Sequence, residues 1–374
     1  MVNTDYSYTY DTRGRLLTVS KNNIEVENYT YDNNGNRLQA IVYGVNTNAS
    51  YTLDDNLEVY GDNTYRYDED GYLVEITTPT ETTTYTYNTL GALTKVQTPT
   101  KTINYHLNAL NQRVAKEVNG VITEKYLWAN LTTLLAIYDK DDNLVQRFEY
   151  ADQRMPLSMT SNSTKYYLHY DQVGTLRAVS DTNHNIIKEI TYDTYGNILL
   201  DTNPNMKVPF GFAGGLHDTD TKLVHFGYRE YDPHTGKWTA KDPIDFSGGD
   251  SNLYGYVLGD PVNYTDSLGL YNDPRMNVAL PNWNKPLFNP NGATSKIYHG
   301  LKKGIPKAFS GLLGGLQKLD NYSNTCHNNL LGDTLFDYLY LNVQKSNNTN
   351  ELPFNLMDKA DTYNSANKVL NGAN

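Results

Sequence analysis

Cysteine is almost absent from this sequence. Cys326 is the single cysteine among 374 residues, so no disulfide can form within the chain and stability has to come from packing. No run approaches the roughly 18 apolar residues that a membrane-spanning helix needs. No charged-then-apolar signal segment opens the sequence. HExxH, HNH-like and CxxC spacings are also missing, so neither a metal site nor a cofactor is predicted.

Acidic residues outnumber basic ones only in the first part of the chain. Residues 1–270 hold 21 Lys and Arg against 35 Asp and Glu, whereas residues 271–374 hold 10 against 7, which gives the net charge of −11. The acidic body argues against nucleic-acid binding. The mild basic excess of the remainder falls far below the signature of a dedicated nucleic-acid binder. The same boundary divides the tyrosines, because 27 of the 33 precede residue 271.

These tyrosines recur in the frame Tyr-x-Tyr-Asp-x-x-Gly followed by leucine, with Asn in place of Asp in one copy. Strong copies lie about 20 residues apart, with one double step, and a fixed period of this size indicates a repeat architecture. The strong copies occupy residues 8–16, 29–38, 65–73 and 85–93, and weaker copies surround Tyr105, Tyr138, Tyr170 and Tyr192.

Each copy predicts a β-hairpin. Tyr-x-Tyr places both rings on one face of a strand, with the hydroxyl groups expected near water. Asp-x-x-Gly predicts turns at Asp11–Gly14, Asp32–Gly35, Asp68–Gly71 and Asn88–Gly91. The leucine that follows is expected at the second position after glycine, where the returning strand begins. One hairpin cannot bury its apolar face alone, so neighbouring hairpins must stack. An ordinary antiparallel sandwich is the alternative.

Residues 209–270 carry three further motifs: Gly227-Tyr-Arg-Glu-Tyr-Asp-Pro233, Lys241-Asp-Pro-Ile244 and Asn263-Tyr-Thr-Asp-Ser-Leu-Gly-Leu270. With the repeats, this segment resembles the Rhs-repeat-associated core domain of Rhs/YD-repeat proteins. The resemblance implies a mainly β fold, in which an antiparallel YD-repeat hairpin array forms a partial Rhs shell. It implies YD/Rhs repeats over residues 1–208 and the core domain over residues 209–270. A variable effector-like tail over residues 271–374, small and mainly α or poorly ordered, would follow.

In some relatives, an arginine and two aspartates at these motif positions are implicated in self-cleavage after the terminal Gly-Leu. The resemblance therefore nominates Arg229, Asp242 and Asp266 as catalytic residues and Leu270–Tyr271 as the cleaved bond. The chemistry is sound, because two close carboxylates share a proton, so one can activate water and the other protonate the leaving group. Arg229 would orient a carboxylate or polarise the scissile carbonyl. The alternative is that both aspartates merely open turns. The family usually has proline where this chain has Ser267, and serine is expected to loosen the turn.

The tail carries only weak signals. Asparagine is enriched, four early prolines predict an extended linker, and an amphipathic pattern predicts a glycine-broken helix over residues 300–319. That helix would either face a core or lie on a membrane surface. Two further helices are expected near Asp333 and after Pro353. The tail candidates for nuclease-like acid–base or metal chemistry are His299, His327 and Asp333, with Cys326 and Asp337 beside them. Surface histidines on a small helical domain are the alternative.

The resemblance implies the C-terminal part of a bacterial polymorphic toxin used in interbacterial competition. A cognate immunity protein for the tail, and an upstream Rhs shell or secretion-system component, would be its partners. Because no signal segment is present, secretion or surface association would use a non-classical or upstream-encoded route. The chain begins inside a repeat, which suggests a truncated gene or displaced cassette. The competing hypotheses are a non-enzymatic cell-surface or carbohydrate-binding repeat protein and a decayed toxin cassette.

Overall fold

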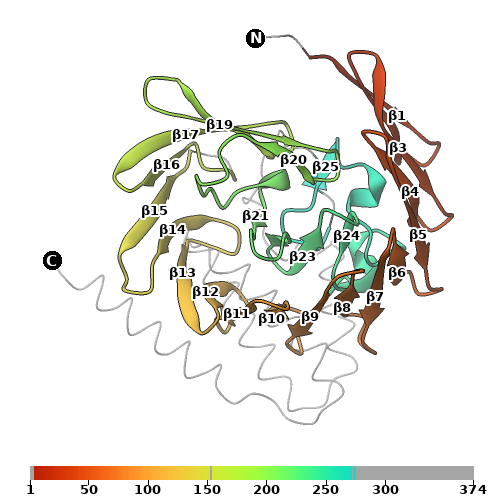
Figure 1. The fold of residues 1–374 in the computed structure, drawn as a ribbon, viewed down its shortest axis with the longest axis horizontal. Helices are drawn as coiled ribbons and strands as arrows, with labels where there is room; N and C mark the ends of the chain where they lie inside the picture. Colours follow the sequence, from red (N-terminus) through yellow and green to blue (C-terminus); the bar gives the residue numbers. More distant parts are fainter. Residues whose placement is uncertain (1–3, 152–153, 272, 275–374) are drawn as a thin grey trace, which may run out of the picture. The chain divides into compact units, whose positions relative to one another are not determined.

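Twenty antiparallel strands form the hairpin array in a computed structural model of the chain (Figure 1). The structure describes residues 4–151, 154–271 and 273–274, all within the first of the chain's two units, residues 1–285. Every strand pairs with the next one along the chain, as in β1–β2, β2–β3 and β19–β20. The predicted mainly β hairpin array is therefore confirmed for the described residues. The expected helical tail lies outside them.

The array strands are short and evenly spaced. They are β1 (Tyr6–Tyr10), β2 (Leu16–Lys21), β3 (Ile24–Tyr31), β4 (Arg37–Val42), β5 (Val45–Tyr51), β6 (Leu57–Tyr60), β7 (Asn63–Tyr67), β8 (Leu73–Thr77), β9 (Thr82–Tyr87), β10 (Leu93–Gln97), β11 (Thr102–Leu107), β12 (Arg113–Val118), β13 (Val121–Trp128), β14 (Leu134–Tyr138), β15 (Leu144–Glu149), β16 (Ser158–Ser161), β17 (Thr164–Tyr170), β18 (Leu176–Ser180), β19 (Ile186–Tyr192) and β20 (Ile198–Asp201).

All four predicted turns are confirmed. Each glycine amide donates to the carbonyl of the aspartate or asparagine three residues earlier, for example Gly14 to Asp11 at 3.0 Å. The Asp11 carboxylate also accepts the backbone N–H groups of Arg13 and Arg15, at 2.8 and 2.9 Å. The four glycines adopt φ between +78° and +88°, a region that other residues enter only with strain. The local chemistry of the repeat is therefore sufficient to fix its turn.

A register shift lies just before the second tyrosine of each strong repeat, and the residue that pairs with this tyrosine after the turn points into the core. The pairs Tyr10–Leu16, Tyr67–Leu73 and Tyr87–Leu93 show it. We call the position opposite this tyrosine, or opposite the residue that replaces it, the leucine position. Leu144, opposite Tyr138, is 52% exposed, but six leucines at this position are at most 2% exposed, namely Leu16, Leu57, Leu73, Leu93, Leu134 and Leu176. One expectation is wrong here. In the copy at residues 29–38, Arg37 occupies the leucine position opposite Tyr31, and Leu38 is 39% exposed.

The tyrosines behave differently from expectation in one respect. Rings such as Tyr29 point inward as the alternation predicts, but their hydroxyl groups do not stay near water. Tyr29 donates to the Glu27 carboxylate at 2.7 Å, and Tyr31 donates to the Leu16 carbonyl at 2.8 Å. Burial raises the pKa of both phenols well above the usual value. The hydroxyl groups are thus buried hydrogen-bond donors, whose acceptors come from the same strand for Tyr29 and from β2 for Tyr31.

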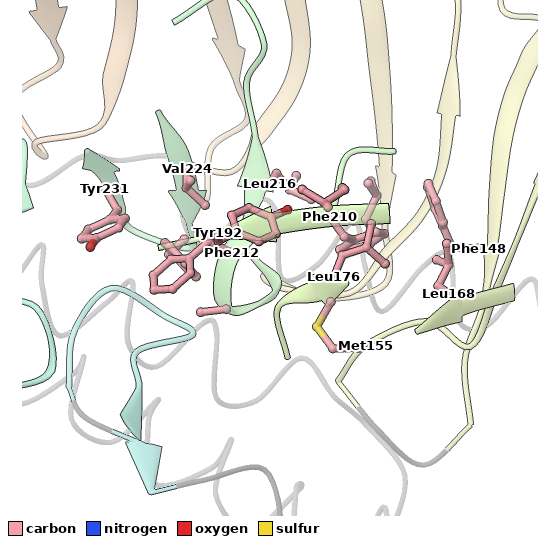
Figure 2. Close-up of a cluster of buried hydrophobic side chains, with 14 of the residues drawn as sticks. Phe148, Met155, Leu168, Leu176, Tyr192, Phe210, Phe212, Leu216, Val224 and Tyr231 are labelled. Carbon is pink, nitrogen blue, oxygen red and sulfur yellow. The ribbon is translucent and has the colours of Figure 1, made fainter. Parts of the chain in front are cut away.

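Residues 209–270 form short elements that pack against the array, whose strands curve around them in Figure 1. Figure 2 shows the shared core, where Phe148, Leu168 and Leu176 of the array meet Phe210, Phe212 and other side chains of the segment. Within the described ranges, no helix is long and apolar enough to cross a membrane. The short elements are η1 (Phe212–Gly214), β21 (Leu216–His217), β22 (Val224–Phe226), β23 (Arg229–Asp232), β24 (Lys237–Trp238), η2 (Asp245–Gly248), η3 (Val257–Gly259), β25 (Tyr264–Thr265) and β26 (Asp273–Pro274).

Candidate functional site

The candidate site is built around Arg229, at the start of β23. The preceding turn contains Gly227, whose φ is +41° and where an added Cβ would lie 2.6 Å from the Leu268 carbonyl oxygen. That close approach lets the Tyr228 amide donate to the same carbonyl at 2.8 Å. The Arg229 guanidinium lies 4.2 Å from the centre of the Trp238 ring and is only 4% exposed. Packing against Trp238 therefore holds the Arg229 side chain in place independently of its acidic partners.

Arg229 brings the two predicted aspartates together. Its Nη2 lies 3.0 Å from Oδ2 of Asp242 and 3.3 Å from Oδ2 of Asp266. The aspartates are 8% and 3% exposed, so both carboxylates and the guanidinium are buried together. Asp242 also opens a turn, because its Oδ1 accepts the Ile244 amide at 2.9 Å. The turn interpretation and the charged-cluster interpretation therefore hold for the same residue.

Asp266 holds the end of the segment. Its Oδ1 accepts the Leu270 amide at 2.9 Å. Burial raises the pKa of Asp266, and Arg229 and the backbone amides of Leu270, Tyr271 and Gly269, which hydrogen-bond to it, oppose that rise. The Tyr271 amide nitrogen is the nitrogen of the 270–271 peptide bond. Ser267 was expected to loosen this turn. In the structure, the Asp266 side chain closes the turn over residues 266–270, and Gly269 supplies a φ of +71° within it.

The Leu270 carbonyl faces Asp242 across Gly248. A Cβ at Gly248 would lie 2.6 Å from Oδ2 of Asp242 and 2.7 Å from the Leu270 carbonyl oxygen. A cavity of about 10 Å³ lies here. It is lined by Arg229, both aspartates, Leu270 and Tyr271. Its volume is close to the roughly 10–15 Å³ that one water molecule needs. Glycine at position 248 therefore keeps open the gap between a carboxylate and the peptide bond.

Arg229 contacts the backbone one residue before the expected carbonyl. Its Nε donates to the Gly269 carbonyl at 2.5 Å, and its Nη1 donates to the Leu253 carbonyl at 3.2 Å. We expected Arg229 either to orient a carboxylate or to polarise the Leu270 carbonyl. The observed contacts fit the first role, because both carboxylates share Nη2. The bond from Arg229 to the Gly269 carbonyl also anchors the segment that carries the 270–271 bond.

Burial dominates the electrostatics of the cluster. It raises the pKa of the Asp242 carboxyl to about 6, against the opposing effect of Arg229. Burial also raises the pKa of Asp266 and lowers the pKa of Arg229. Loss of solvation thus favours the neutral form of all three groups.

Several functional residues escaped the sequence analysis. The glycine at position 248 indicates a bulge or a close backbone approach, but nothing in the sequence shows that Asp242 and Leu270 are the groups that approach it. A second buried cluster joins array and segment, where Arg113 pairs with Glu230 at 2.9 Å and Lys116 pairs with Asp218 at 2.8 Å. These partners are more than 100 residues apart, so spacing could not reveal them.

The tail candidates His299, His327 and Asp333 lie outside the described residues. Within the described part, no group of three or more His, Cys, Asp and Glu side chains is placed to hold a metal ion.

Comparison with known proteins identifies the repeats. A family model described as Teneurin YD-shell matches residues 2–256. Teneurin-1 of Gallus gallus is 31% identical over 305 residues, covering 76% of this chain and 11% of that protein. Teneurin-4 of Mus musculus is 34% identical over 246 residues, covering 64% and 9%. The chain thus spans about a tenth of the length of these relatives.

Two solved structures show a more distant likeness. A crystal structure of TcdB2-TccC3-TEV is 17% identical, with a TM-score of 0.30 over 71% of this chain and 19% of that chain. The Tc holotoxin pore of Photorhabdus luminescens is 17% identical, with a TM-score of 0.32 over 74% and 18%. The family match includes Arg229 and Asp242 and stops before Asp266. Because it covers most of the chain, together with the Tyr-Asp repeats and their hairpins, the chain belongs to the teneurin YD-shell family of YD-repeat proteins.

Proposed function

We propose that residues 209–271 form an aspartyl-type self-cleaving site that cuts the Leu270–Tyr271 peptide bond. One observation carries the proposal: a single buried guanidinium holds two carboxylates beside that bond. Aspartic dyads use the same principle, in which two close carboxylates share one proton and act as acid and base. The cavity of about 10 Å³ that these groups line supplies the place for the attacking water.

The positions of the carboxylates assign their roles. Asp242 faces the Leu270 carbonyl across the gap, so its ionised form takes a proton from water as the water oxygen attacks that carbon. Asp266 lies at the Tyr271 amide, so it delivers a proton to that nitrogen as the carbon–nitrogen bond breaks. The products are a carboxylate at Leu270 and an amine at Tyr271, with one water consumed. Arg229 holds both carboxylates and balances their charge.

In this proposal the chain is the C-terminal part of a bacterial Rhs/YD-repeat polymorphic toxin. The array and the core segment form the partial shell, and the residues after Leu270 form an effector released by cleavage. An immunity protein would bind the effector, and an upstream shell or secretion-system component would export the protein to the cell surface or medium. The effector's activity is the part of the proposal that rests on the resemblance alone.

The test is the purified full chain on a denaturing gel. Wild type is expected to give fragments of 270 and 104 residues, with Tyr271 as the new N-terminus by mass spectrometry. Asp266→Asn is expected to stay intact, because its amide cannot deliver the proton. Asp181→Asn, in an exposed array turn whose aspartate also accepts backbone amides, is the matched control and should cleave. An intact wild-type chain with native circular dichroism would contradict the proposal.

A second candidate has one observation in its favour. Curated relatives of the chain are animal teneurins from chicken and mouse, so a YD-shell of this kind does not by itself indicate a toxin. A non-enzymatic cell-surface or carbohydrate-binding repeat protein would remain intact and bind glycans through residues 1–270. An intact chain that binds no glycan, with a tail that is harmless on expression, would point to a decayed cassette.

A further inference from the structure

Two arginines occupy the leucine position of the array, and their buried positive charges are neutralised in different ways. Arg37 stands opposite Tyr31, and Arg113 stands opposite Leu107. Arg113 pairs with the Glu230 carboxylate at 2.9 Å. Arg37 has no carboxylate within ion-pair distance among the described residues. Because buried arginines are rarely found without an opposite charge, Arg37 needs another source of compensation.

The contacts of Arg37 are all to neutral groups. Its Nη2 donates to the Tyr60 hydroxyl and to the His234 carbonyl, both at 3.3 Å. Its Cζ lies 4.4 Å from the centre of the Tyr195 ring, and the Tyr29 and Tyr60 rings surround it farther away. Its Nε is buried and has no hydrogen-bond partner within the part of the chain that the structure describes. The rings compensate part of the charge and leave the guanidinium incompletely bonded.

A second buried cation lies beside Arg37. The Lys237 ammonium donates to Oδ1 of Asn36 and Asn252 at 2.5 and 3.2 Å, and no carboxylate in the described ranges lies within ion-pair distance. Asp55, Asp250 and Asp32 act on it only from farther away, and burial lowers its pKa to about 7. Amide oxygens satisfy its hydrogen bonds but do not neutralise its charge.

Arg37 and Lys237 line the same cavity. Its volume is about 200 Å³, more than ten times the roughly 10–15 Å³ that one water molecule needs. Arg13 and Arg15 line it with the two buried cations, and Asp250 is the acidic residue in its lining. Arg15 is paired with Asp11, but the other three cations have no such partner among the described residues. Arg13 is exposed, so the cavity reaches solvent there.

We propose that this cavity binds a small ligand that carries a carboxylate or phosphate group. Such an oxyanion would supply the charge that Arg113 receives from Glu230 and that Arg37 lacks. Charge-assisted hydrogen bonds to arginine and lysine are the strongest that a protein offers an oxyanion. The Tyr31 and Tyr195 rings, which also line the cavity, give the rest of the ligand a face to pack on. This cavity shares Asp250 and Gly255 with the cavity at the Arg229 cluster, but Arg37 and Lys237 line only this one, and the proposal does not depend on cleavage.

The test is calorimetric titration of the full chain with three molecules built on one sugar ring. Glucuronate presents a carboxylate, glucose 6-phosphate presents a phosphate, and glucose is the neutral control. At least one anion is expected to bind about tenfold or more tightly than glucose, because a charge-assisted hydrogen bond contributes about 1.5–3 kcal/mol. The stronger anion then identifies the ligand's chemical group. Equal, unsaturable signals from all three would overturn the proposal.

Variants locate the site. Arg13→Gln, at the exposed rim, is expected to weaken the anion about threefold, as for an exposed ion pair. Arg37→Gln is expected to weaken it about tenfold or more. Arg66→Gln, an exposed arginine on β7 that is absent from the cavity lining, is the matched control and should bind as wild type. If Arg37→Gln does not fold, Arg13→Gln alone decides, and identical affinities of the Arg13 and Arg66 variants would overturn the proposal.

Discussion

Removing the guanidinium of Arg113 should destabilise the protein strongly. Arg113 and Glu230 are 3% and 6% exposed, and the Arg113 guanidinium carbon lies 3.7 Å from the centre of the Tyr105 ring. In Arg113→Met the apolar stem is retained, but the buried Glu230 carboxylate keeps only His225 as a partner, at 2.7 Å. Breaking a buried pair on one side costs about 3–5 kcal/mol. We expect a loss of that size in the free energy of unfolding.

The same array offers a matched control. Arg66 and Glu75 form an ion pair of 3.0 Å with 61% and 30% exposure, so Arg66→Met should cost about 0–1 kcal/mol. Urea unfolding followed by tryptophan fluorescence measures both variants. High salt should abolish the small Arg66 effect and leave the Arg113 effect largely unchanged. Arg113→Met combined with Glu230→Leu should recover much of the loss, because no buried charge then remains unpaired. Equal losses for Arg66→Met and Arg113→Met would refute this reasoning.

Three further predictions concern the site and the turns. Gly248→Ala should slow cleavage by roughly 100-fold, because its Cβ lies 2.6 Å from Oδ2 of Asp242 and must displace it by most of an ångström. Gly249→Ala, whose Cβ meets nothing within 4 Å, should still cleave on the same gel time course. Cleavage should accelerate as pH rises through about 6, where Asp242 ionises. Because its folded pKa lies above the ordinary 3.8, the stability it contributes is full below pH 3.8 and lost through about pH 6. Gly35→Ala should cost about 1–2 kcal/mol in thermal or urea unfolding. Gly71→Ala should cost more, because its Cβ would lie 2.5 Å from the hydroxyl of the buried Tyr254 ring.

The hairpins could be predicted from sequence because their causes are local. Asp11 bonds to amides two and four residues on, and Gly14 supplies the positive φ, so one short frame contains everything that the turn needs. Leucine was wrongly expected at the inward position that Arg37 occupies, because that position is decided by contacts beyond the local frame. The frame favours leucine, and residue 38 is a leucine, but the turn geometry fixes which residue points inward. Tertiary neighbours, Tyr195 above all, make arginine tolerable there.

The candidate site was only partly visible in the sequence. The resemblance supplied Arg229, Asp242 and Asp266, but spacing gave no reason for residues 24 positions apart to share one guanidinium nitrogen. Gly248 could be read as a close backbone approach, but the groups that a side chain there would displace, Asp242 and the Leu270 carbonyl, could not be read from the sequence. Lys237 was equally hidden, because its burial depends on Asn36, which is 201 residues away. Contacts of this range follow from packing and not from any local pattern.

The pairing of each strand with its immediate successor has a kinetic consequence. Hairpins close short loops at low entropic cost, so the array can form progressively from its N-terminal end during synthesis. The contacts of residues 209–270 are of the opposite kind, because Asn263 bonds to Tyr10, 253 residues earlier, and Tyr254 bonds to Gly71, 183 residues earlier. The segment can dock only after the array exists. Folding order would therefore make the proposed cleavage site the last part to assemble, so that any self-cleavage would have to wait until the array is folded.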